Sequence, residues 1–198
     1  MTAGDAKKIR FAPDGMLSIA PLGGTVTLPT DVGDGETAPS GFKALGYVTE
    51  NGVTITPTIQ TTPLPAWQSA VPVLYNVDSA TFQVQATLLE TSKIVTETFF
   101  GASWVAVTED NGGTQTPTGD YRLDISSVPD LKELALVVDW KHKGSLYRAV
   151  VGRCMVAERG AITLQRTQAQ QYEITFDAMD SGGNLGYILT NEDMSGTV

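Results

Sequence analysis

This sequence has a single cysteine and a single histidine among its 198 residues. Cys154 has no partner for a disulfide within the chain, and its apolar surroundings are typical of a buried cysteine that acts as a small hydrophobic residue. His142 stands between two lysines in a predicted turn, far from the second histidine or the cysteines that a zinc site or a nucleophilic triad would need. The residues therefore indicate no enzyme, and we expect no cofactor and no metal.

Charge is scarce as well, and positive charge most of all. Charged residues make up 18% of the chain, the net charge is −9, and the only cation between Ala44 and Tyr121 is Lys93. A protein that grips nucleic acid needs lysines and arginines to neutralise phosphates. The composition excludes such a protein and leaves two interpretations: an acidic surface that serves solubility, or a surface that DNA passes without binding.

No apolar run approaches the roughly 20 residues that span a bilayer. The first residues also lack the basic and then apolar pattern of a secretory signal. We expect a chain that is made and assembled in a cytoplasm.

The sequence does contain strong strand patterns. Apolar and polar residues alternate along 80–90, while 131–140 and 146–156 are apolar on both faces and joined by a turn at 141–144; both patterns are typical of strands. Residues 162–179 alternate too, which predicts one long strand or two strands bent around 168–171. A single short helix is expected over 92–100, capped by Thr91 or Ser92 and ended by Gly101.

Segments rich in proline and glycine separate these strands. We expect an N-terminal arm over about 1–15, a long loop over about 21–45 and a C-terminal tail over about 181–198, all in one domain spanning 1–198. Residues 46–50 and 53–58 are predicted to pair across an Asn51-Gly52 turn. The segment 57–73 should then be an extended arm with few ladder bonds that reaches a neighbouring subunit, since proline cannot donate to a ladder; its proposed contact residues are Pro57, Pro63, Leu64, Pro65 and Trp67.

Several short stretches, in order along the chain, resemble one known family. They are PLGGT from Pro21, LGYVTENGVT from Leu45 with Trp67 beyond it, LLET from Leu88 with FFG from Phe99, KELALVVDW from Lys132 and AERG from Ala157. Together they resemble the major tail tube proteins of long-tailed bacteriophages, over most of the chain. None of the stretches is a catalytic signature, so the resemblance concerns an architecture.

The resemblance implies a mainly β fold, an antiparallel β-sandwich or partly closed barrel with one short flanking helix and extended arms. It implies a structural virion protein that forms hexameric rings, stacked into a tube through which DNA is ejected into the host. The implied partners are further copies of the chain, a tape-measure protein, a tail terminator and distal tail or baseplate proteins, with DNA passing through the lumen without specific binding and no membrane insertion.

Two polar strand faces are candidates for the lumen wall. They carry threonine, glutamine and acidic residues without any lysine or arginine: Thr81, Gln83, Gln85 and Thr87 on one strand, and Glu173, Thr175 and Asp177 on the other. A conduit wall must be wet and must not pair with phosphates. The alternative is that these faces look outward to solvent.

Two other classes of protein remain open. A carbohydrate-binding or adhesin-like β-sandwich would use Trp67 and Trp140 as stacking platforms, although secretion would then be expected. A metal-independent enzyme on a β scaffold is disfavoured because no catalytic constellation is present.

Overall fold

The computed structural model describes residues 4–5, 8–23, 26–128 and 131–195. Within these ranges the chain is mainly β, with a single short helix, as predicted. The strands and the helix are β1 (Asp14–Pro21), β2 (Lys43–Ala44), β3 (Val48–Ala66), β4 (Ser69–Leu88), α1 (Lys93–Phe100), β5 (Trp104–Asp110), β6 (Gln115–Leu123), β7 (Leu134–His142), β8 (Ser145–Arg159), β9 (Tyr172–Ala178) and β10 (Tyr187–Thr190).

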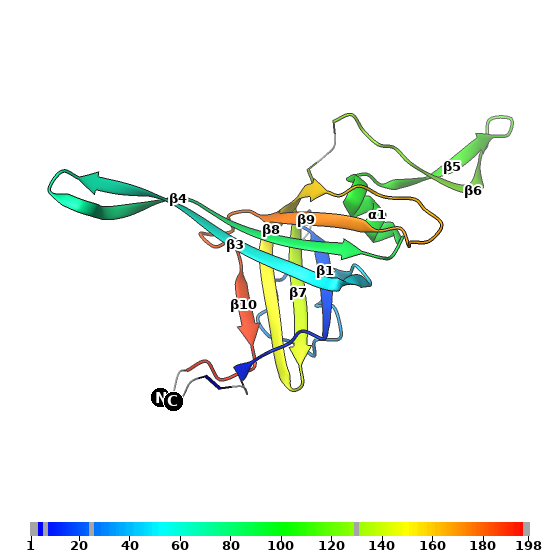
Figure 1. Ribbon diagram of the computed structural model, residues 1–198. Helices are drawn as coiled ribbons and strands as arrows, with labels where there is room; N and C mark the ends of the chain where they lie inside the picture. The colour runs from blue at the N-terminus through cyan, green and yellow to red at the C-terminus, as the bar shows by residue number, and fades with distance from the viewer. Residues whose placement is uncertain (1–3, 6–7, 24–25, 129–130, 196–198) are drawn as a thin grey trace.

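One antiparallel sheet carries the fold, in the order β2-β1-β7-β8-β9-β4-β3. Its end strands β2 and β3 do not pair with each other, so the sheet is not closed into a barrel. The long strand β8 pairs with β10 near its start and with β9 near its end. Figure 1 shows the two parts of the sheet crossing steeply, with β7 and β10 upright and β9, β4 and β3 running across. The arrangement is consistent with a β-sandwich.

The main core joins the two parts of the sheet. It combines side chains from both parts, such as Leu17 and Leu136 from the upright part and Val84 and Phe176 from the crossing part. Burial of such side chains is the dominant favourable term in folding.

Helix α1 covers this core as the sequence predicts. Ser92 accepts a hydrogen bond from the Val95 amide at 3.3 Å, and Gly101 ends the helix in the left-handed conformation at φ 69°. The β-branched residues of α1 make it a weak helix alone. Packing therefore holds it, and Phe99 stacks edge-on against Tyr172 of β9.

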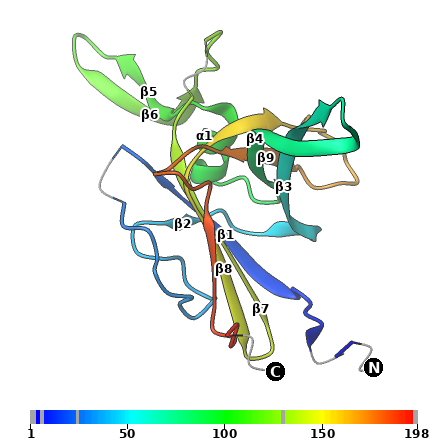
Figure 2. The same ribbon diagram turned by 90° about the vertical axis from the view of Figure 1, so that its left-hand side faces the viewer.

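The opposite side of the upright part is covered by the loop between β1 and β2. Phe42 and Leu28 of the loop pack against Val137 and Val150 of the sheet, and Figure 2 shows the loop beside β1 and β8. A buried ion pair lies under this loop: Arg148 Nε donates to Asp139 Oδ1 at 2.6 Å, and both side chains are at most 3% exposed.

The same arginine also forms a hydrogen bond to the loop between β1 and β2. Its Nη1 donates to the carbonyl of Asp31 at 3.1 Å. A Cβ on Gly33 would lie 2.7 Å from Arg148 Nη2, and Gly33 has φ 57°, so the position accepts glycine alone without strain. The predicted long loop thus packs on its own chain over part of its length.

Two predictions about the extent of strands in the body are wrong. Residues 46–58 do not form a hairpin: 48–66 is one continuous strand along β4, and Asn51-Gly52 lies in a bulge between the pairs Val48–Leu88 and Val53–Ala86. Asn-Gly suits positive φ in a bulge as well as in a turn. The first part of 162–179 is not a strand either. Residues 160–171 form a loop, where Leu164 is exposed, and only Tyr172–Ala178 pairs in the sheet.

Candidate assembly surfaces

The segment 57–73 is part of a long β-hairpin. Strand β3 pairs with β4 as far as Ala66 and Ser69, around a tight turn at Trp67-Gln68. The expectation of few ladder bonds is therefore wrong, because β4 supplies a partner strand. The prolines are tolerated because β3 is the edge strand of the sheet, where one side of the backbone has no ladder to lose.

The outer part of this hairpin is exposed and apolar. Figure 1 shows it extending far beyond the rest of the sheet. Trp67 at its tip is 98% exposed, and Asp78 is the only charged residue between Pro57 and Ser79. Other large exposed hydrophobic residues here are Ile59, Leu64, Val71, Val73, Leu74, Tyr75 and Val77. Exposed apolar patches of this kind are typical of interaction surfaces.

The two polar strand faces lie side by side. The register pairs Gln83 with Asp177 and Gln85 with Thr175, and Gln85 Nε2 donates to Glu173 Oε1 at 2.7 Å. Thr87 pairs with Glu173 in the same ladder, and Thr81 lies two residues before Gln83 on β4. The structure thus joins the seven predicted residues into one polar face on β4 and β9.

That face continues onto β3, which the sequence analysis missed. Thr54, Thr56 and Thr58 are the register partners of Gln85, Gln83 and Thr81. The signal was the alternation of threonine at every second position. Exposure along the face is uneven: Thr175 is only 7% exposed, whereas Thr54 and Gln85 are exposed.

A second hairpin, β5–β6, also leaves the body. Its local sequence indicates only the turn, at Asp110-Asn111-Gly112-Gly113. Its base is fixed to α1, because Trp104 donates from Nε1 to Thr96 Oγ1 at 2.8 Å and from its backbone amide to Glu97 Oε1 at 2.9 Å. Beyond this base nearly every residue is exposed. The hairpin carries the acids Glu109, Asp110 and Asp120 and one cation, Arg122.

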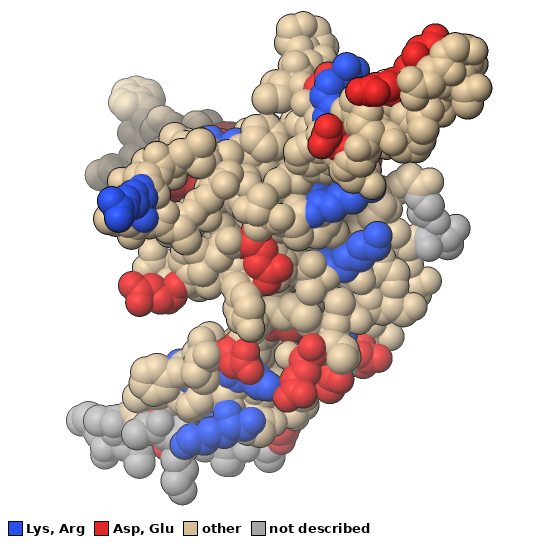
Figure 3. All heavy atoms as spheres, turned by 90° about the vertical axis from the view of Figure 1, so that its right-hand side faces the viewer, with Lys and Arg blue, Asp and Glu red and all other residues tan. Residues whose placement is uncertain are grey.

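A groove of about 700 Å³ lies between α1 and the β1–β2 edge of the sheet. Ile19, Ile94 and Val156 are among the apolar side chains that line it, together with Lys43, Lys93, Lys132 and Arg159. Figure 3 shows lysine and arginine side chains gathered below the projecting hairpin on this side of the molecule. Sequence reasoning missed the cluster because its members come from four separate segments.

The N-terminal arm and the C-terminal tail are in contact near the β7–β8 turn. Glu192 of the C-terminal tail accepts hydrogen bonds from Ser145, from Tyr147 Oη at 2.6 Å and from Arg10 Nε at 2.7 Å. These donors, Ser145 first, lower the pKa of the Glu192 carboxyl to about 2. We name this contact of Glu192 with Arg10, Ser145 and Tyr147 the terminal clasp.

The remaining candidates for chemistry are structural. Burial raises the pKa of the Cys154 thiol to about 12, which leaves it unreactive. His142 packs edge-on against Phe11, and Trp140 stacks flat on Tyr147 with ring centroids 5.3 Å apart. In the described ranges, no group of three or more His, Cys, Asp and Glu residues is placed to hold a metal. No helix in the same ranges is long and apolar enough to cross a membrane.

A comparison with protein families gives one match, and it spans nearly the whole chain: residues 2–197 match the family described as phage tail tube protein. A search of curated proteins finds no match. The matched family is a structural one and points to a non-enzyme. A match over this length settles the family: the chain belongs to the phage tail tube proteins, structural components of the virion tail.

Proposed function

We propose that the chain is the ring subunit of a tail tube, in which six copies form each ring and stacked rings form the conduit for DNA ejection. The observation that carries the proposal is the β3–β4 hairpin. A two-stranded hairpin alone is marginally stable in water, and this one exposes large apolar side chains with a single charge over 23 residues, Pro57 to Ser79. Burial against other copies removes that surface from water.

Open sheet edges support lateral contacts between copies. The sheet ends at β3 on one side and at β1 on the other, where β2 pairs with only Ser18 and Ile19. An exposed edge is a template for pairing with another chain. A ring in which the β3 edge of one copy meets the β1–β2 edge of the next would cover both of these end edges.

The polar face on β3, β4 and β9 fits the wall of the conduit. Its described side chains are threonine, glutamine, Glu173 and Asp177, with no cation in the registers that pair Thr54–Gln85, Gln83–Asp177 and Thr87–Glu173. Phosphates therefore find no counter-charge as DNA passes. The same role assigns the tape-measure protein, the tail terminator and the distal tail or baseplate proteins as partners, and the host cytoplasm as the place of assembly.

Negative-stain microscopy and sedimentation of the purified protein test the tube. Rings or tubes formed without a cofactor are expected. A monodisperse monomer at every concentration, with or without the tape-measure protein, contradicts the proposal and favours an adhesin-like module. Only Trp67 would then remain as a free platform, since Trp140 is stacked on Tyr147.

The lumen assignment needs its own experiment. Gln85→Lys with Thr56→Lys places two cations on exposed positions of the face, and should leave tubes intact while slowing DNA ejection from assembled phage. Thr175→Lys is a poor choice because Thr175 is buried. Normal ejection from intact variant tails would remove the lumen assignment and leave the tube standing.

A further inference from the structure

The basic groove beside α1 concentrates positive charge in an acidic protein. The chain has 13 lysines and arginines and a net charge of −9. Four of those cations, Lys43, Lys93, Lys132 and Arg159, line this one groove of about 700 Å³, with Glu97 as its one acid. Such a concentration raises the local affinity for a negatively charged segment.

These cations are poorly neutralised within their own chain. Lys93 Nζ is 3.9 Å from Glu97, and among the described residues Lys132 Nζ donates to Ser103 Oγ at 3.5 Å. Arg159 donates to the carbonyl of Phe99 at the end of α1. In the part of the chain that the structure describes, Lys43, Lys132 and Arg159 make no ion pair.

The complementary segment is the part of β5–β6 beyond the base pair Trp104–Leu123, which we name the outer part of this hairpin. It carries three acids against one arginine, and neither Glu109 nor Asp120 forms an ion pair among the described residues. Val105 and Tyr121, 56% and 67% exposed, can cover the apolar lining of the groove.

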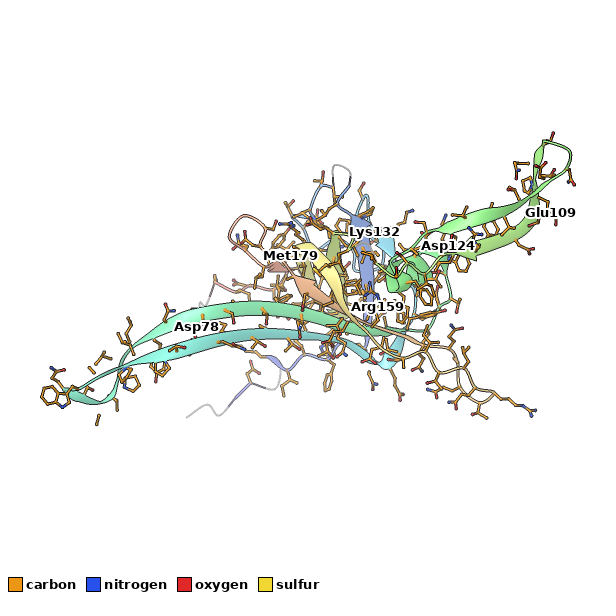
Figure 4. All side chains as sticks on the ribbon, turned by 90° about the horizontal axis from the view of Figure 1, so that it is seen from above. Asp78, Glu109, Asp124, Lys132, Arg159 and Met179 are labelled. Carbon is orange, nitrogen blue, oxygen red and sulfur yellow. The ribbon has the colours of Figure 1, made fainter. Side chains whose placement is uncertain are left out.

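In this conformation the acidic tip of the hairpin lies away from the basic groove of its own chain. Figure 4 shows Glu109 at the far end of β5–β6, whereas Lys132 and Arg159 lie beside the body near its base. The seven residues of β5 span roughly 24 Å at about 3.4 Å per residue. The acidic tip is thus carried outward, to where a second copy would be.

We propose that the acidic outer part of β5–β6 of one copy binds in the basic groove beside α1 of a neighbouring copy. The inference rests on the proposed tube, and it assigns one of the tube's repeated contacts. The two surfaces lie on different parts of the molecule, so the contact is head-to-tail and propagates from copy to copy. Its charge complementarity also rejects a misplaced neighbour that would bring like charges together.

Charge reversal tests the contact. Lys43→Glu with Lys132→Glu, and separately Glu109→Lys with Asp120→Lys, should each lower the sedimentable fraction at least tenfold with little change in Tm. The four substitutions combined in one chain should restore assembly, because the complementarity is then re-created with opposite sign. Arg166→Glu on the exposed 160–171 loop makes the same kind of charge change away from the groove and should assemble as the wild type does.

A crosslink tests the geometry directly. Glu109→Cys with Lys132→Cys in one chain should give disulfide-linked ladders in assembled tubes, since Cys154 is buried and does not compete. Absence of ladders from intact tubes, or full assembly of both charge-reversed variants, overturns the contact.

Two further outcomes are distinguishable. If wild-type protein never assembles, the proposed tube fails. If it assembles, and the groove variants also assemble but lose a salt-dependent binding of duplex DNA that the wild type shows, the groove is a nucleic-acid site and the protein–protein contact is overturned.

Discussion

The two hairpins that project from the body differ in the chemistry of their exposed side chains. β3–β4 continues the main sheet and carries large exposed apolar side chains with one charge, Asp78. β5–β6 forms a separate two-stranded sheet, is fixed at its base through Trp104, and carries mostly acidic charge. Apolar burial is strong and non-directional, whereas charge sets specificity and rate of association. The difference assigns strength of assembly to β3–β4 and choice of neighbour to β5–β6.

The largest effect is expected from shortening β3–β4. Replacing residues 61–78 by Asn-Gly joins the paired residues Gln60 and Ser79 through a tight turn. Assembly should be lost while the monomer keeps its Tm within a few degrees, because this outer part lies outside both core clusters. Sedimentation and thermal unfolding measure the two quantities. Deleting 57–65 alone would leave part of β4 unpaired and is the worse experiment.

If the shortened chain unfolds instead, the hairpin belongs to the folding unit. If it still forms tubes, the assignment of strength to β3–β4 is wrong.

Loss of the Arg148–Asp139 pair should instead lower the stability of the folded monomer. Arg148→Met leaves Asp139 buried without a counter-charge, which costs about 3–5 kcal/mol of unfolding free energy. Burial already raises the pKa of Asp139 against the opposing effect of Arg148. The exposed pair Arg153–Glu133 is the matched control, and Arg153→Met should cost about 1 kcal/mol or less. Denaturant unfolding of the shortened monomer measures both.

A double variant separates the charge from the packing. Asp139→Leu with Arg148→Met removes the unpaired carboxylate and should recover much of the loss. Equal destabilisation by the single and double variants would place the cost in the lost contact between Arg148 and the loop at Asp31.

A higher salt concentration should weaken the contacts of β5–β6 and leave those of β3–β4 intact, with a smaller effect on assembly. Raising NaCl from 0.05 to 0.5 M shortens the Debye length from roughly 14 to about 4 Å, which weakens a contact between charged surfaces and leaves apolar burial intact. The rate of tube growth should therefore fall several-fold, while finished tubes stay assembled. Light scattering follows both. Growth that speeds up with salt would show that repulsion between acidic copies dominates.

The sequence predicts well what depends on local patterns. The cap and stop of α1 at Ser92 and Gly101, and the β7–β8 hairpin, follow from residue types at fixed spacing. The joining of Gln85 to Thr175 depends on which strands become neighbours, and the groove depends on bringing Lys43, Lys93, Lys132 and Arg159 together from separate segments. Pairing over such distances has no local signature. Pro57, Pro63 and Pro65 misled for the same reason, since an edge strand and an unpaired arm have the same composition.

The smallest effect concerns the terminal clasp, which should be independent of both hairpins. The pKa of Glu192 is lowered in the folded chain to about 2, against about 4.3 for an unfolded glutamate. A lowered folded pKa means that the clasp contributes stability above pH 4.3 and loses it as the pH falls through about 2. In the shortened monomer, the Glu192 carboxyl carbon followed by NMR should titrate near pH 2. Tyr147→Phe, which removes one donor, should move that midpoint upward. A midpoint near 4 in the parent would show that the clasp is not formed.

The same titration tests whether the β3–β4 hairpin and the body are coupled. The midpoint is compared between the shortened chain and a chain that keeps β3–β4 but carries Trp67→Ala to weaken assembly. A difference between the two midpoints would show coupling.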